Sequence, residues 1–169
     1  FSVITIDCTK YLIALVGPTA VGKTSTAIAL ATHFNSQILS ADSRQLYWEM
    51  NIGTAKPSSR ELKLIKHHFI STLSIHDPYT VFDYENEVNT LLKCLFREHD
   101  ILFLVGGSGL FVRAVCEGLE EIPALDKRIR ELLNKEFDNG GFSDLVRELE
   151  EVDPAHYAMV DINNPRRVT

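Results

Sequence analysis

The stretch Tyr11–Thr24, which reads YLIALVGPTAVGKT, decides the fold. It opens with a continuous apolar run, Tyr11–Val16, as expected for a central strand buried on both faces of a parallel sheet. The next segment, Gly17–Thr24, matches the pattern G-x-x-x-x-G-K-[ST], and apolar residues at helical spacing continue to Phe34. A strand, a glycine-rich turn and an amphipathic helix in this order predict a phosphate-binding loop, or P-loop.

Each part of this loop has a chemical purpose. Gly17 and Gly22 let successive backbone N–H groups approach phosphate oxygens at the N-terminus of a helix. Lys23 adds a positive charge over the terminal phosphate, and the hydroxyl of Thr24 is the predicted ligand of a Mg²⁺ ion. The predicted phosphate-binding residues are Gly17, Pro18, Thr19, Ala20, Val21, Gly22, Lys23 and Thr24.

Strands and helices alternate beyond the loop. The pattern predicts further strands at Gln37–Ala41, His67–Leu73 and Ile101–Val105, a helix that Asp83 caps, and a helix at Leu110–Cys116. This order is typical of an α/β fold with a P-loop NTPase-like parallel sheet, flanked by helices and joined by right-handed crossovers.

The pattern changes after Pro123, where no strand is predicted. Helices are expected from Leu125 to Phe137, from a Ser143 cap to Val152, and over residues 154–160. We therefore expect three parts: a P-loop α/β core at 1–122, a small all-helical insertion at 123–163, and a return to the core at 164–169, where Pro165 starts a helix.

The bulk properties narrow the class of protein. The 169 residues, with 45% apolar side chains, suit one globular domain with a small appendage. No apolar run approaches the roughly 20 residues of a membrane span, and Cys8, Cys94 and Cys116 are too scattered for a disulfide framework, so we expect a cytoplasmic protein without a membrane partner. The net charge of −6 argues against nucleic acid as a partner unless a local basic strip exists.

The loop alone leaves the reaction open. Most P-loop proteins act on a nucleotide γ-phosphoryl group and hold Mg²⁺ with an acid at the end of a second strand. The strand Ile101–Val105 runs into Gly106-Gly107-Ser108, so Asp42, after the second strand, is the acid placed to face the phosphates. A carboxylate there can support a metal, accept a proton, or simply cap a turn. Spacing alone fits a small-molecule kinase and a transferase with a pyrophosphate leaving group equally well.

Six segments, in order along the chain, resemble the tRNA dimethylallyltransferases, also called tRNA isopentenyltransferases. The segments are Gly17–Thr24, Ser40–Gln45 with Tyr47, Asn51–Pro57, His67–Ile70, Val105–Leu110 and Asn164–Val168. Together they span about Tyr11 to Val168, and six in register are far more specific than any one of them.

The resemblance implies a function. The P-loop core would hold dimethylallyl pyrophosphate and Mg²⁺, and the helical insertion would grip the tRNA anticodon stem-loop. The reaction would transfer the dimethylallyl group to the exocyclic N6 amine of the adenosine 3′-adjacent to the anticodon. Asp42 matches the family's general base, and Ser108 lies near the reacting amine, at a position where Thr is usual.

The resemblance also implies a set of tRNA-binding residues, and we expect the protein to be a monomer. They are Asp42, Ser43, Arg44, Gln45, Ser108, Arg130, Asn164, Pro165, Arg166, Arg167 and Val168. The chain departs from the family at Phe111, where Tyr is common, at Ser71, where Asp is usual, and over residues 1–10. Family chains are roughly twice as long, so we expect this one to be truncated.

Three alternatives stay open. An adenylate isopentenyltransferase shares the loop but accepts free AMP, ADP or ATP, and a small P-loop kinase would consume ATP with an acceptor. A truncated chain could also bind nucleotide or tRNA without turnover. The helical stretch after Pro123 and the segment Asn164–Arg167 favour tRNA.

Overall fold

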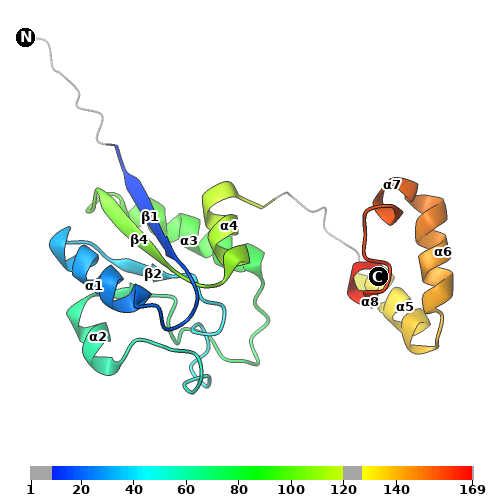
Figure 1. Cartoon of the computed structure of the whole chain (residues 1–169), viewed down its shortest axis with the longest axis horizontal. Helices are drawn as coiled ribbons and strands as arrows, with labels where there is room; N and C mark the ends of the chain where they lie inside the picture. The colour runs from blue at the N-terminus through cyan, green and yellow to red at the C-terminus, as the bar shows by residue number, and fades with distance from the viewer. Residues whose placement is uncertain (1–8, 120–126, 169) are drawn as a thin grey trace, which may run out of the picture. The chain divides into compact units, whose positions relative to one another are not determined.

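The computed structural model describes residues 9–119 and 127–168 (Figure 1). The chain divides into two compact units, Phe1–Leu119 and Glu120–Thr169. Among the described residues, no helix is long and apolar enough to cross a membrane.

Over its described residues, the first unit is built on a parallel sheet of four strands in the order β1-β4-β2-β3. Strand β1 (Tyr11–Val16) pairs with β4 (Ile101–Gly106) along its whole length. Strand β4 also pairs with β2 (Ile38–Ser40), which pairs with the two-residue β3 (His67–His68). The predicted parallel α/β sheet is confirmed.

Helices cover both faces of this sheet. Successive side chains of β4 point to opposite faces, and because they are apolar, both faces must be buried. Phe103 packs with Ala27 and Ala31 of α1 (Lys23–His33) on one face. Leu102 and Leu104 pack on the other face in a cluster that includes residues of α3 (Val81–Leu95), and α4 (Gly109–Glu117) adds partly buried side chains there. The two apolar clusters lie on either side of the sheet and hold the loops at the strand ends in place.

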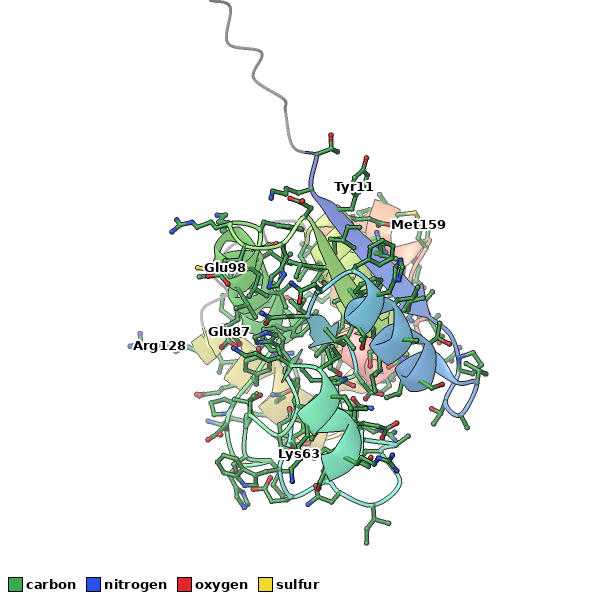
Figure 2. The ribbon with its side chains drawn as sticks, turned by 90° about the vertical axis from the view of Figure 1, so that its left-hand side faces the viewer. Tyr11, Lys63, Glu87, Glu98, Arg128 and Met159 are labelled. Atoms are coloured by element: carbon green, nitrogen blue, oxygen red, sulfur yellow. The ribbon has the colours of Figure 1, made fainter. Side chains whose placement is uncertain are left out.

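Strand β1 differs from its prediction. It was expected in the centre of the sheet, but among the described residues it is an edge strand, hydrogen-bonded to β4 alone. Tyr11, labelled in Figure 2, is 56% exposed, and Val16 is 60% exposed. The prediction was wrong because an apolar run indicates only that the side chains of a strand favour burial. The position of the strand in the sheet depends on which other strands pair with it.

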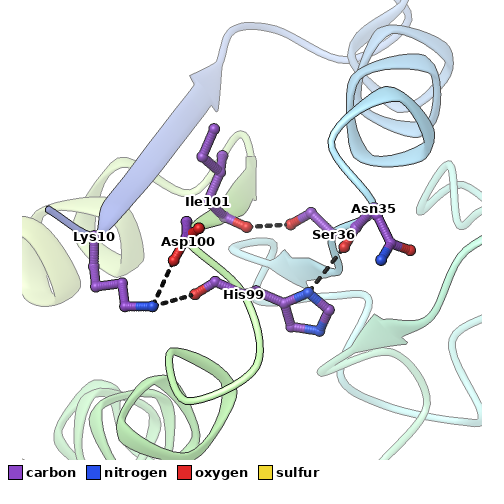
Figure 3. A network of polar contacts seen from close by, with 6 residues as sticks. All are labelled: Lys10, Asn35, Ser36, His99, Asp100 and Ile101. Atoms are coloured by element: carbon purple, nitrogen blue, oxygen red, sulfur yellow. Dashed lines mark hydrogen bonds and ion pairs between the residues drawn. The ribbon is translucent and has the colours of Figure 1, made fainter. Parts of the chain in front are cut away.

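A polar network fastens the amino ends of the strands (Figure 3). Lys10 forms an ion pair of 2.6 Å with Asp100, just ahead of β4, and also donates to the carbonyl of His99. The His99 ring bonds through Nδ1 to the carbonyl of Asn35, and the Ser36 hydroxyl donates to the carbonyl of Ile101. The carboxyl ends, where ligands of such sheets bind, lie at the opposite edge.

Two helix starts differ from their predictions. Thr80, not Asp83, is the N-cap of α3, and Asp83 is its partner in a capping box. A helix that was not predicted, α2 (Ser59–Leu64), begins with another capping box, formed by Ser58 and Glu61. Both boxes follow the pattern S/T-x-x-E/D, which was therefore the available signal.

The predicted strand His67–Leu73 is confirmed only over β3. Phe69 and Ser71 have φ angles of 62° and 52°, in the left-handed region that an extended strand excludes. Leu73 keeps a single bridge to Tyr47. The chain therefore leaves the sheet after His68 and turns toward the ligand-binding edge.

The second unit consists of helices over its described residues, 127–168. They are α5 (Lys127–Asp138), α6 (Phe142–Val152), α7 (Pro154–Tyr157) and α8 (Pro165–Val168). Leu125, predicted to start the first of them, lies outside the described residues. Ser143 does not cap α6, whose N-cap is Gly141, whereas the Asp153 carboxylate caps α7.

Candidate active site

The P-loop lies between β1 and α1, at the carboxyl edge of the sheet. Three residues of the loop have positive φ angles: Gly17 at 150°, Ala20 at 68° and Gly22, the N-cap of α1, at 91°. Gly22 needs the conformational freedom of glycine for this turn. The loop thereby delivers the chain to the N-terminus of a helix, where backbone N–H groups favour anions.

Lys23 folds back over the loop. Its Nζ atom donates a hydrogen bond of 2.6 Å to the carbonyl oxygen of Pro18. The ammonium group is thus held close to the P-loop. If a phosphate bound there, the ammonium would donate to a charged phosphate oxygen in place of the neutral Pro18 carbonyl.

A cavity of about 300 Å³ adjoins the P-loop, and we call it the P-loop cavity. Loop and helix residues Thr19, Lys23 and Thr24 line one side of it. The rest of its lining comes from Ala20, Gly22, Ser25, Ala27, Ile38, Ser40, Asp42, Gln45, Ala55, Pro57, Glu61, His67, Ile70, Val105 and Gly106. Cationic and hydroxyl groups thus share one cavity with several apolar side chains, which suits a phosphate group with an apolar substituent.

A second cavity, of about 190 Å³, lies beside the first, and we call it the polar cavity. Its lining is Pro18, Thr19, Asp42, Ser43, Arg44, Gly53, Thr54, Gly107 and Ser108. The two cavities share Thr19 and Asp42. The Asp42 carboxylate therefore borders a space at the P-loop and a separate space lined by polar groups.

Asp42 lies two residues beyond Ser40, the last residue of β2, and is half-buried. Its Oδ1 atom accepts a hydrogen bond of 3.0 Å from the backbone N–H of Arg44. This bond spans two residues and shapes the local turn. Asp42 therefore stabilises the turn and also borders both cavities, because the hydrogen bond to Arg44 holds its carboxylate where the cavities meet.

Ser108 connects β4 to the segment after β2. It occupies the N-cap position of α4, but its hydroxyl makes no capping bond. The hydroxyl instead accepts from the backbone N–H of Ser43 at 2.9 Å and donates to the Ser43 hydroxyl at 3.2 Å. The structure thus brings Asp42, Ser43, Arg44 and Ser108 together around the polar cavity.

Gly106 permits this approach of β4 to the end of β2. A Cβ atom at Gly106 would lie 2.1 Å from the backbone oxygen of Ala41. The same oxygen accepts a hydrogen bond of 3.2 Å from the backbone N–H of Ser108. Only glycine at position 106 lets the two segments meet here, which explains the glycine that ends β4.

Gln45 holds the segment 47–57, which we call the 47–57 loop. Its Oε1 atom accepts from the Ser40 hydroxyl at 3.0 Å. Its Nε2 atom donates to the carbonyls of Thr54 and Ala55 at 3.1 and 3.2 Å. Both donor bonds stay within the protein, so the side chain fixes a loop that supplies residues to the lining of both cavities. Sequence reasoning missed this role because no regular spacing links Gln45 to its partners, which lie 5, 9 and 10 residues away in an irregular segment.

His67 lines the P-loop cavity and belongs to one of the six resembling segments, but it was not among the predicted site residues. Its Nδ1 atom bonds the carbonyl of Ile65 at 2.8 Å, and its Nε2 atom is buried without a partner among the described residues. Burial lowers the pKa of His67, which favours the neutral ring. His68 faces the other side of the sheet and bonds Gln37 Oε1 at 2.7 Å, and burial lowers its pKa as well.

The remaining predicted residues divide between the units. Gly17 and Val21 belong to the P-loop but line neither cavity. Arg130 is exposed on α5, and Asn164, Pro165, Arg166, Arg167 and Val168 lie at or before α8. This second group belongs to the second unit and stays a prediction from the resemblance.

Comparison with known proteins decides the family. A sequence profile described as IPP transferase matches residues 45–169. The chain belongs to the IPP transferase family. Its relatives in this family include a tRNA dimethylallyltransferase 1 of Bacteroides fragilis, 45% identical over 159 residues, and a tRNA dimethylallyltransferase of Flavobacterium johnsoniae, 46% identical over 157 residues. These alignments cover 94% and 93% of this chain but 53% and 51% of the relatives, so the chain spans about half their length.

Solved structures of IPP transferases agree with the fold. A tRNA isopentenylpyrophosphate transferase from Bacillus halodurans is 35% identical and superposes with a TM-score of 0.65, over 95% of this chain and 53% of that one. A eukaryotic dimethylallyltransferase solved acting on tRNA superposes with a TM-score of 0.77 over 95% of this chain and 40% of that one. At 24% identity, the second comparison supports the fold alone.

Proposed function

We propose that the protein to which this chain belongs transfers a dimethylallyl group from dimethylallyl pyrophosphate to the N6 amine of the adenosine 3′-adjacent to the tRNA anticodon. The observation that carries the proposal is the position of Asp42 on the wall shared by the P-loop cavity and the polar cavity. A transferase with two substrates needs such a boundary, because its donor and acceptor must meet at one catalytic group. The names of the relatives supply the substrates.

In this mechanism the P-loop cavity holds the donor. The backbone N–H groups of the loop and the Lys23 ammonium bind the pyrophosphate, and Lys23 leaves the Pro18 carbonyl to do so. Apolar residues of the same cavity, among them Ile70 and Pro57, accommodate the dimethylallyl group.

The polar cavity receives the adenine, which must leave its stack to reach it. Its exocyclic amine is a weak nucleophile because the lone pair is delocalised into the ring. As nitrogen attacks the allylic carbon, the new N–C bond forms and the C–O bond to pyrophosphate breaks, with its electron pair leaving on oxygen. The amine proton passes to the Asp42 carboxylate, which acts as general base.

A Mg²⁺ ion fits the residues present. The Thr24 hydroxyl lines the P-loop cavity together with Asp42, and Mg²⁺ characteristically takes one or two protein oxygens plus substrate phosphates and water. Thr24 would ligate the ion, and its charge would stabilise the negative charge that develops on the departing pyrophosphate.

The proposal extends to the second unit and to the cellular setting. We propose that Arg130 and the segment 164–168 contact tRNA phosphates, in a monomeric cytoplasmic enzyme. Such contacts supply a local basic strip on an otherwise acidic chain. Free AMP, ADP or ATP as acceptor, and a kinase reaction, have no specific support from the cavities or the relatives.

The test measures transfer of radiolabelled dimethylallyl pyrophosphate to unmodified tRNA, with AMP alongside, using the protein at its full natural length. Asp42→Asn keeps the shape of the side chain and removes the base, so we expect kcat to fall by about 10²–10⁴-fold while KM for the pyrophosphate changes little. Asp100→Asn, an exposed carboxylate paired with Lys10, is the matched control and should keep wild-type kcat. Unchanged kcat in Asp42→Asn would remove Asp42 from the chemistry, and label in AMP rather than tRNA would move the enzyme to the free-nucleotide class.

A further inference from the structure

The 47–57 loop carries an apolar side chain that nothing described covers. Ile52 is 96% exposed, whereas Thr54, two residues later, is only 6% exposed. The loop is therefore anchored at its base, while its tip projects an isoleucine into solvent. Large exposed aliphatic side chains are common on protein surfaces, so exposure alone decides nothing. The tip indicates a contact site because its backbone is held rigidly and because it lies beside the polar cavity.

Hydrogen bonds lock the loop from within. The Lys56 ammonium donates to the carbonyl of Tyr47 at 2.5 Å and to Asn51 Oδ1 at 3.1 Å. The Asn51 amide in turn donates to the carbonyl of Trp48 at 2.7 Å. The residue just before Ile52 is thus held from two sides.

The loop is also tied to its surroundings. The Thr54 hydroxyl donates to the carbonyl of Met50 at 2.8 Å, and Gln45 grips the carbonyl of Thr54. Lys56 also donates to the Ser71 hydroxyl at 3.0 Å, at the position where an Asp was expected from the resemblance. Because these bonds fix the backbone on both sides of the tip, Ile52 cannot fold back onto the protein to hide its side chain.

The tip borders the polar cavity. Gly53 and Thr54, the next two residues, line that cavity together with Asp42 and Ser108. A ligand that enters the polar cavity on the side of Gly53 and Thr54 therefore passes close to Ile52. On the proposed function, that ligand is an adenosine drawn out of a stack of bases, which leaves the face of a neighbouring base uncovered.

We propose that Ile52 packs against the exposed face of the nucleobase adjacent to the acceptor adenosine. The inference rests on the proposed function and names a contact on the rim of the same site. A rigid aliphatic side chain covers the face of a base without a hydrogen-bond requirement, so it accepts any base, and its burial contributes to binding. The alternative occupant is another part of the protein's own chain.

The experiment uses the protein at its full natural length and an RNA hairpin of the anticodon stem-loop. The fluorescent base 2-aminopurine replaces the base on one side of the acceptor adenosine or, in a second hairpin, on the other side. Variants are Ile52→Ser, Ile52→Leu and the control Leu64→Ser, which alters an aliphatic residue that is 61% exposed at the end of α2. The measurements are the Kd for each hairpin, the 2-aminopurine emission at saturation, KM for dimethylallyl pyrophosphate, and Tm.

We expect Ile52→Ser to weaken hairpin binding about tenfold, the effect of withdrawing one aliphatic side chain from an interface. The emission change at one flanking position should disappear, while Tm and KM for the pyrophosphate stay at wild-type values. Ile52→Leu should restore binding to within about twofold, and Leu64→Ser should change none of the four quantities.

Two results would overturn the inference. If Ile52→Ser leaves both Kd and emission unchanged, the side chain does not contact a base. If Tm falls while Kd holds, Ile52 is covered by the protein itself. Wild-type transfer of label to the hairpin separates this inference from the proposed function: label transfer with an insensitive Ile52 refutes only the contact, and absence of transfer and binding refutes both.

Discussion

Replacing Gly106 with Ala should be among the most damaging single-methyl changes in the first unit. The added Cβ would lie 2.1 Å from the Ala41 oxygen and 2.3 Å from its carbonyl carbon, so the segments must separate by about 1 Å to reach a normal contact. That movement strains two hydrogen bonds of Ala41, to the Val105 carbonyl at 2.8 Å and from the Ser108 N–H at 3.2 Å. Overpacking of about 1–3 kcal/mol and about 1 kcal/mol for each weakened bond give a loss of about 3–5 kcal/mol.

Urea unfolding followed by circular dichroism measures this loss, because the midpoint and the slope give the free energy of unfolding. Gly109→Ala is the matched control, since a Cβ at Gly109 meets nothing within 4 Å and Gly109 begins α4. Its helix propensity should make it neutral or stabilising by up to about 1 kcal/mol. The reasoning is refuted if Gly106→Ala costs less than about 1 kcal/mol, or if both variants lose the same amount.

Two further predictions concern stability. Tyr84→Phe removes a buried hydroxyl that donates to the Ser40 carbonyl at 2.8 Å but keeps the ring stacked on Phe111, so the free energy of unfolding in urea should fall by about 1–2 kcal/mol. Tyr79→Phe is the partly exposed control, and an equal loss in both variants would contradict the burial argument. Because burial lowers the pKa of His67 and His68, these two imidazoles bind fewer protons in the folded protein than in the unfolded chain near pH 6.5. Their contribution to the free energy of unfolding is therefore full above that pH and is lost as the pH falls toward the folded pKa values. Urea midpoints between pH 7.5 and 5.5 should fall less steeply in His67→Asn than in wild type or in the exposed control His76→Asn, and parallel slopes in all three proteins would refute the assignment.

Local signals in the sequence predicted the parts of the fold that depend on neighbouring residues. The P-loop needs only its own glycines, lysine and threonine between a strand and a helix, and the apolar run Ile101–Val105 is buried as a central strand should be. Asp42 was placed at the site by the rule that ligands of parallel sheets bind at the carboxyl ends of strands.

Features that depend on distant partners could not be predicted in the same way. Phe69 ends β3 with a positive φ angle that its residue type rarely adopts, and it does so while it packs edge-to-face on Tyr84. The Gln45 amide donates to two carbonyls of the 47–57 loop, a pairing that no spacing in the sequence predicts. Asp83 was mistaken for the cap because an acid at the third helical position and an acid at the cap look alike in a sequence.

The outer edge of β1, which no other strand pairs within residues 9–119 and 127–168, has a consequence for handling the protein. Tyr11–Val16 is an uncharged, proline-free segment of β-branched, aromatic and other apolar residues, and over the described residues it pairs on one side alone, with β4. Such a segment is a template for intermolecular β-pairing and amyloid-like stacking. The strand lies directly ahead of the P-loop, so aggregation through β1 would also affect the candidate site. Solubility should consequently improve when β1 is covered by a pairing strand, or when an outward-facing residue such as Ile13, 37% exposed, is replaced by Lys as a gatekeeper.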